Sequence, residues 1–213
     1  VPVTTDGDPV GYMQDLSGND NHATQATSAS RPIYRTDGTL HWLQADGVDD
    51  NMTSPIPPVN TSFIRSAAFA LREPPSGTAP VFDVIGDDYF NFGTFYVRAQ
   101  ESARYAVGSV WRGGASYRAF PQDGSLPETV VLSLSAIRNG GAFARKNKSG
   151  NQPVNTGDTD MIGSGVSLFG STAGLVNGYS SVDFYGLIYR EGSDENLLGE
   201  AEDYLAKLAG VTL

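Results

Sequence analysis

The sequence predicts an all-β fold, a two-sheet antiparallel β-sandwich completed by one C-terminal α-helix. Short apolar or alternating runs are separated throughout by turn-forming residues, and the chain contains 25 Gly and 12 Pro, a pattern typical of many short strands. Helical spacing of apolar residues stands out in one run, near the C-terminus. A length of 213 residues fits one all-β domain better than two, so we expect residues 1–213 to form a single domain.

The clearest predicted strand covers residues 129–137. Its alternation places serines on much of one face and an apolar set on the other, namely Val130, Leu132, Leu134 and Ala136. The dipeptide Asn139-Gly140 follows as a hairpin turn, because both residues tolerate positive φ. The other predicted strands cover residues 41–44, 62–72, 79–85, 89–100, 104–111, 115–120, 165–169 and 181–190.

Two of these runs, 62–72 and 181–190, are apolar on both faces in places, which predicts central strands covered on both sides. Residues 52–58 and 73–80 contain several prolines and are predicted as loops, because proline cannot donate to a strand ladder. Residues 151–165, rich in Asn, Gly and Asp, are predicted as one long loop. The basic cluster at 145–148 is predicted as a solvated hairpin tip.

The C-terminal run predicts a helix over about 194–209. Ser193 can cap its N-terminus, and Asp194 and Glu195 suit the positive end of the helix dipole. Gly210 is a natural C′ residue. The apolar residues form one stripe, which we expect to pack against the outside of the sandwich: Leu197, Leu198, Ala201, Leu205 and Leu208.

Charge and composition narrow the classes of partner. The formal net charge is −10, from 24 acidic and 14 basic residues. A field of that sign disfavours nucleic acid and suits cations or neutral partners such as sugars, although solubility alone also explains it.

The chain has no Cys, which excludes disulfides and thiolate sites. No apolar run reaches the ~20 residues of a membrane span. Because the chain begins with Val1, we expect a piece of a longer protein.

Two runs are dense in Asp and Asn. Residues 15–22 read Asp-Leu-Ser-Gly-Asn-Asp-Asn-His, and residues 46–50 read Asp-Gly-Val-Asp-Asp. Calcium prefers six to eight oxygen ligands of this kind, so calcium is a candidate cofactor. The alternative is that these side chains cap tight turns through their own backbone. The candidate ligands are Asp15, Asn19, Asp20, Asn21, Asp46, Asp49 and Asp50.

These runs carry a resemblance to a known superfamily. Together with residues 31–38 and with 182–190, which read Val-Asp-Phe-Tyr-Gly-Leu-Ile-Tyr-Arg, they resemble the concanavalin A-like lectin/glucanase superfamily in its laminin-G-like branch. The first fifty residues resemble more narrowly a segment recurrent in tailed-phage and prophage virion proteins. The sequence departs from that pattern at Asp20, where Gly is expected, at Ala45, where Phe is expected, and at Asn51, where an aromatic residue is common.

The resemblance implies a jelly-roll sandwich and a place on a virion surface. It implies a tail-fibre, head-fibre or decoration module, oligomeric in its assembly, that binds host-surface glycans or neighbouring virion subunits. The charge and the lack of a long apolar run add the expectation of no nucleic-acid binding and no membrane insertion. One alternative is a purely structural assembly or decoration protein. Another is a polysaccharide-active enzyme.

Sugar binding requires aromatic faces beside planar polar groups. Trp111 and Arg112 are the favoured pair, because Gly113-Gly114 places them at a strand end beside a flexible turn. Trp42, Tyr105 and Tyr117 are further candidates. The alternative is that aromatic residues in strands form the core.

Catalytic patterns are missing from the sequence. The superfamily's glucanases alternate acids as Glu-x-Asp-x-x-Glu along one strand, and this chain has no such run. It has no Gly-x-Ser-x-Gly elbow either. His22 and His41 are the only histidines. We therefore expect a protein that is not an enzyme.

Overall fold

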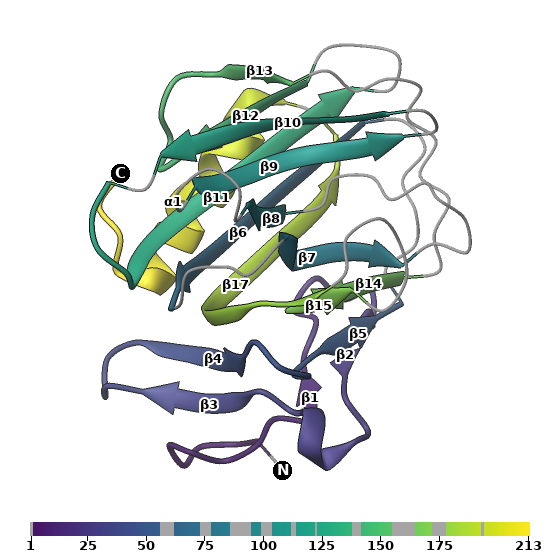
Figure 1. Ribbon diagram of the computed structural model, residues 1–213, viewed down its shortest axis with the longest axis vertical. Coiled ribbons are helices and arrows are strands. Elements are labelled where there is room, and N and C mark those ends of the chain that lie inside the picture. The colour runs from purple at the N-terminus through teal and green to yellow at the C-terminus, as the bar shows by residue number, and fades with distance from the viewer. Residues whose placement is uncertain are drawn as a thin grey trace.

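The computed structural model is a two-layer β-sandwich with a helix on its outside (Figure 1). It describes residues 2–55, 62–72, 78–85, 95–98, 104–111, 114–121, 123–137, 142–154, 165–171, 178–192 and 194–213. All strand pairs within these ranges are antiparallel. The predicted fold class is confirmed.

The first layer is an eight-stranded sheet. Its order is β1 (Tyr12–Met13), β2 (Ala23–Thr24), β5 (Met52–Ser54), β14 (Gly165–Leu168), β7 (Thr78–Ile85), β8 (Phe95–Arg98), β9 (Arg104–Trp111) and β10 (Gly114–Pro121). A short 3-10 helix, Ser28–Ser30, follows β2. The two-stranded ribbon β15 (Gly170–Ser171) and β16 (Gly178–Tyr179) extends from β14.

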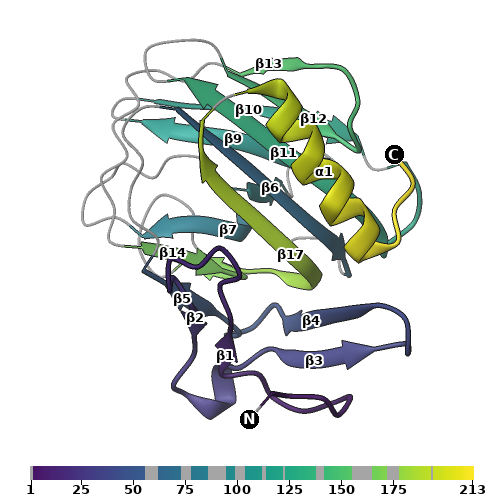
Figure 2. The ribbon, with the colours of Figure 1, turned by 180° about the vertical axis from the view of Figure 1, so that it is seen from behind.

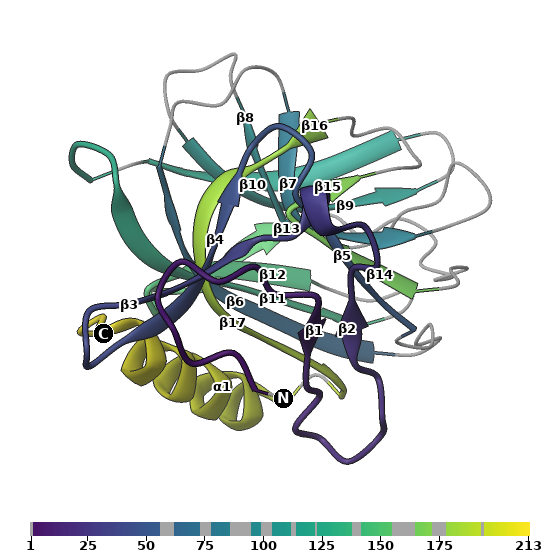
Figure 3. The same cartoon turned by 90° about the horizontal axis from the view of Figure 1, so that it is seen from below.

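The second layer is a seven-stranded sheet. Its order is β13 (Gln152–Val154), β12 (Ala142–Lys146), β11 (Glu128–Ile137), β6 (Ser62–Leu71), β17 (Ser181–Glu191), β4 (His41–Asp46) and β3 (Ile33–Thr36). β6 and β17 lie inside this sheet, as their two-sided apolar character predicts. Figure 3 shows the two layers edge-on, with α1 (Glu195–Ala209) outside the seven-stranded sheet.

The core lies between the inner faces of the two sheets. On β11 the predicted apolar face is confirmed for Val130, Leu132 and Leu134, each no more than 1% exposed. They share one buried cluster with Phe69 of β6 and Phe184 of β17. The side chain of Ala136 and the turn at 138–141 lie outside the described residues.

The serine face of β11 is buried as well, because α1 covers it (Figure 2). Ser133 and Ser135 are 0% and 2% exposed. Small residues let the helix approach: Ala68 of β6 lies in a second buried cluster with Leu205 and Ala206 of α1. At Gly186 of β17 an added Cβ would lie only 3.1 Å from Leu205 Cδ2.

The helix ends are stabilised at both termini. The Asp194 carboxylate, rather than the predicted Ser193, caps the N-terminus by accepting the Asn196 N–H at 2.7 Å. Ser193 lies outside the described residues. Gly210 adopts the predicted left-handed conformation with φ 67° and donates to the Ala206 carbonyl. Within the described ranges, no helix combines the length and the apolar character needed to cross a membrane.

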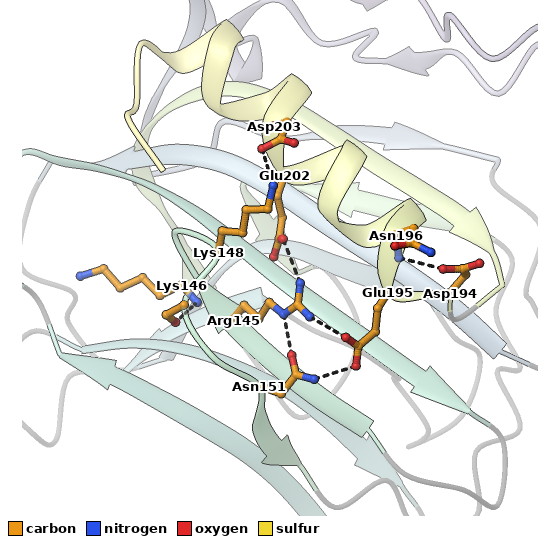
Figure 4. Close-up of polar contacts among 10 residues, drawn as sticks. Arg145, Lys146, Lys148, Asn151, Asp194, Glu195, Asn196, Glu202 and Asp203 are labelled. Carbon is orange, nitrogen blue, oxygen red and sulfur yellow. Dashed lines mark hydrogen bonds and ion pairs between the residues drawn. The ribbon is translucent and has the colours of Figure 1, made fainter.

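Within the basic cluster at 145–148, Arg145 and Lys146 lie on β12 and are largely buried, which corrects the prediction of a solvated hairpin tip for these two residues, whereas Lys148 lies in the turn after β12 and is exposed. Arg145 is 11% exposed and pairs with Glu195 and Glu202 of α1, both at 3.3 Å (Figure 4). Lys146, 7% exposed, turns inward to the carboxylates of Asp123 and Glu128, both at 2.8 Å. Basic side chains on a strand are buried here because each meets carboxylates.

Candidate functional site

Of the five predicted sugar-contact residues, the structure describes the side chains of two. Tyr105 is 1% exposed, stacks edge-on against Phe69 and donates its hydroxyl to the Glu128 carbonyl at 3.2 Å. It belongs to the core and offers no ring to a ligand, which corrects the prediction for this residue. Arg112 and the side chains of Trp111 and Tyr117 lie outside the described residues.

Trp42 lies on the outer face of the seven-stranded sheet. Alternation along β4 sends Leu43 and Ala45 into the core, so Trp42 and Gln44 point the other way. The Trp42 ring is half-buried and lies 5.8 Å from the Tyr185 ring of β17, tilted by 37°. Tyr185 in turn packs beneath α1. Trp42 and Tyr185 therefore form an aromatic pair beside the helix.

A row of planar polar groups crosses the same face. Arg35 Nε of β3 donates to Gln44 Oε1 at 3.1 Å, and Gln44 Nε2 donates to Asp183 Oδ1 of β17 at 3.2 Å. Arg72, directly after β6, places Nε 3.6 Å from Asp183 Oδ1. We call Trp42, Gln44, Arg72, Asp183 and Tyr185 the outer-face platform.

Asp183 is the acidic centre of the outer-face platform. Burial raises its pKa, and the Gln44 amide and the Arg72 guanidinium partly offset that rise by favouring the charged carboxylate. The indole Nε1 of Trp42 is buried and makes no hydrogen bond of ordinary geometry. The platform thus sets an aromatic surface beside an amide, a guanidinium and a carboxylate, the groups that a sugar's C–H face and hydroxyls require.

The turn at 46–50 holds three carboxylates against the strand ends. Asp46 Oδ1 accepts the Val48 N–H at 2.8 Å, and the Asp46 N–H donates to Asp50 Oδ2 at 2.9 Å. Asp49 Oδ2 accepts the Ser30 hydroxyl at 3.0 Å. Gly47 is required here, because its φ is 80° and an added Cβ would lie 3.0 Å from the Ser181 backbone N.

Three carboxylates converge in this turn. One carboxylate oxygen from each of Asp46, Asp49 and Asp50 lies within 4.8 Å of the others, the single such group among the described residues. Asp50 is 5% exposed. Burial raises its pKa, and the charges of Asp46 and Asp49 add to the rise. A hard cation would relieve this repulsion and accept three carboxylate ligands.

In the turn at 15–22, the predicted ligand Asp15 takes the alternative role, that of closing the turn. Asp15 Oδ1 accepts the Ser17 N–H at 2.8 Å, and Oδ2 accepts the Ser17 hydroxyl at 2.8 Å and the Asn21 N–H at 3.0 Å. These bonds, that of the Ser17 N–H foremost, lower the pKa of Asp15. The Asn19 side chain donates to Ser17 Oγ at 3.0 Å. Donors already point at this carboxylate, so it closes the turn.

Comparisons with known proteins identify the fold but no family. No family model matches the chain, and no curated protein sequence matches it. Among solved structures, it is similar to the Trypanosoma rangeli sialidase, with a TM-score of 0.61 and 14% identity over 96% of this chain and 32% of that one.

Two further structures share the sandwich. The botulinum neurotoxin type G receptor binding domain matches with a TM-score of 0.57 and 11% identity over 92% of this chain and 51% of that one. Domain 4 of AbnA, an extracellular arabinanase from Geobacillus stearothermophilus in complex with arabinotriose, matches with a TM-score of 0.55 and 12% identity over 80% of each chain. These likenesses show a common β-sandwich, compatible with a concanavalin A-like jelly roll. The chain spans about a third of the sialidase and half of the toxin domain.

Proposed function

We propose that this chain is a carbohydrate-binding module without catalytic activity. The observation that carries the proposal is the outer-face platform, where half-buried Trp42 stands beside the planar polar groups of Gln44 and Asp183. The folds it resembles support the carbohydrate-binding part of the proposal, because one of them is a domain in complex with arabinotriose and another belongs to a sialidase.

The pattern of acids supports binding without hydrolysis. Glycoside hydrolysis needs two carboxyl groups flanking the scissile bond, about 5–9 Å apart. The sequence has no Glu-x-Asp-x-x-Glu strand to present them. On the platform, Asp183 is bonded to Gln44 and paired with Arg72, which suits a group that orients a hydroxyl.

We place this module on the surface of a phage or prophage particle. The resemblance of the runs at 15–22 and 46–50 to virion proteins supports this setting. Many copies on one particle would multiply weak single sites, since linked binding events can raise avidity by about 10²–10⁴. The partner would be a glycan of the host surface.

A glycan array tests the proposal. The protein is displayed multivalently on beads and applied to neutral and sialylated glycans, and the bound glycans are then assayed for new reducing ends. We expect binding to a defined subset and no new reducing ends. Silence across the whole array would contradict sugar binding and favour a purely structural assembly protein, and new reducing ends would establish an enzyme.

A further inference from the structure

A second exposed aromatic residue stands on the edge strand β1. Tyr12 is 54% exposed, and Leu16 in the following turn is 80% exposed. Tyr204 on α1, at 51%, is the other exposed aromatic residue among those whose exposure the structure describes. Core packing does not account for Tyr12, because β1 contributes only partly buried Met13 to the core cluster. The ring is therefore available to a partner.

His22 lies against Tyr12 in a defined orientation. The two ring centroids are 5.0 Å apart, with a tilt of 51°. The Asp15 N–H donates to His22 Nδ1 at 3.0 Å, so the proton of the neutral ring is on Nε2. Nε2 lies 3.6 Å from Asp20 Oδ1, and the two side chains are 27% and 91% exposed. An N–H donor and a carboxylate acceptor thus stand together beside an aromatic ring.

The Asp20 carboxylate takes no part in closing the turn at 15–22. The φ of Asp20 is 57°, a conformation that glycine adopts more readily than any residue with a Cβ. The turn is closed by Asp15 through Ser17 and Asn21, without the Asp20 carboxylate. The Asp20 backbone is therefore strained at a position where the carboxylate is exposed and is not needed to close the turn. Backbone strain of this kind clusters at ligand sites.

We propose that Tyr12, Asp20 and His22 form a contact site for a neutral glycan, which we call the turn site. This rests on the proposed function and adds a contact surface to it. The turn site belongs to the edge of the eight-stranded sheet, whereas the outer-face platform belongs to the seven-stranded one. A pyranose places its C–H face on Tyr12, while one hydroxyl donates to the Asp20 carboxylate and a hydroxyl oxygen accepts the His22 Nε2–H.

Charge selects the class of glycan. The acceptor in the turn site is an exposed carboxylate, and the whole chain carries −10. A sialylated or uronic-acid ligand would bring a second negative charge next to Asp20, which is unfavourable. A neutral sugar meets no such repulsion, and its hydroxyls gain charge-assisted hydrogen bonds.

The test compares three variants on the array of neutral glycans and their sialylated counterparts. Tyr12→Ala removes the ring, and Asp20→Gly removes the carboxylate while relieving the positive φ. Tyr204→Ala removes an equally exposed ring on α1 and serves as the control. We expect both turn-site variants to lose about tenfold in affinity for the bound neutral glycans, the control to bind like the wild type, and sialylated counterparts to bind more weakly than neutral ones.

The Asp20→Gly variant separates binding from folding. Its melting temperature should equal or exceed that of the wild type, because glycine suits this backbone. Unchanged affinity in both Tyr12→Ala and Asp20→Gly, with a wild type that binds, would overturn the turn site and leave the proposed function intact. A wild type that binds no glycan would overturn both. Preference for sialylated over neutral glycans would contradict the turn site alone.

Discussion

Trp42 and Tyr105 are both aromatic residues on strands, and only their surroundings separate recognition from packing. Tyr105 faces inward and its hydroxyl donates to the Glu128 carbonyl. Trp42 faces outward beside Gln44 and Asp183. Strand periodicity alone defines two faces but does not show which face is buried. Both residues were therefore candidates for sugar contact, and the sequence could not distinguish the exposed one from the buried one.

Truncating Trp42 should weaken glycan binding with a modest effect on folding. Trp42→Ala removes the aromatic face and its contact with Tyr185, and we expect about a tenfold loss of affinity, the equivalent of about 1.4 kcal/mol. Titration of the bound array glycans by calorimetry measures it. Tyr204→Ala is the control. Equal glycan affinities for Trp42→Ala and wild type would contradict a role of the outer-face platform in glycan binding.

The three-carboxylate turn should bind calcium. We propose a dissociation constant below about 1 mM, the weak end of extracellular sites, and a rise in melting temperature when calcium is added. Calorimetric titration of chelator-treated protein measures it. Asp49→Asn should weaken binding about tenfold, whereas Asp15→Asn should not, because Asp15 is saturated by turn donors. The absence of any heat of binding at calcium concentrations below about 1 mM would contradict this proposal.

Asp50 should make its own contribution to pH dependence. Burial raises its pKa above 3.8 in the folded protein, so the folded state binds more protons than the unfolded state over the interval from 3.8 up to the raised value. Stability from this group therefore falls as pH rises through that interval. Asp50→Asn should gain stability relative to wild type between pH 3.5 and pH 7 in chelator, measured by urea unfolding. A difference in unfolding free energy between Asp50→Asn and wild type that stays constant over this pH range would contradict a raised pKa of Asp50.

At the scale of elements, α1 is held by charge as well as by apolar packing. Glu202 is 0% exposed and meets Arg145 at 3.3 Å. Burial raises the pKa of Glu202, and Arg145 partly offsets that rise. The ends of the helix follow from local residues, while this contact joins positions 57 apart in sequence.

Removing Arg145 should destabilise the fold strongly. Arg145→Ala leaves Glu202 buried without its guanidinium, and we expect a loss of about 3–5 kcal/mol in the free energy of unfolding. Lys148→Ala breaks only the exposed pair with Asp203 and should lose about 1 kcal/mol or less. Urea unfolding measures both. The double change Arg145→Met with Glu202→Met should recover much of the loss, and equal losses for the two single variants would contradict a buried pair.

The elements differ in how far the sequence could predict them. β9 and β11 follow from long periodic runs, and α1 follows from its stripe and its C-terminal Gly210. β5 and β13 were predicted as loops, and both are three residues long. β5 ends before Pro55 and is held by β2 and β14, and β13 is an edge strand that tolerates Pro153. Strands this short are defined by their partners, which no local pattern records.

At the scale of the whole molecule, a sandwich with two covered inner faces leaves its outer faces and turns for recognition. The helix covers β11, β6 and β17, and the outer-face platform lies beside it on β4 and β17. The Asp and Asn content of the turn at 15–22 allowed two interpretations, a cation site or the capping of a tight turn. The structure assigns Asp15 to turn closure, a role that depends on backbone N–H directions rather than on composition.

The central claim is that a sugar ring contacts aromatic side chains of this sandwich. Saturation-transfer difference NMR tests it most directly, with the neutral glycans that bind on the array as probes. We predict strong transfer to the C–H protons of one sugar face, reduced in Trp42→Ala and in Tyr12→Ala and unchanged in Tyr204→Ala. No saturation transfer to any of these glycans, or equal transfer in all three variants, would contradict it.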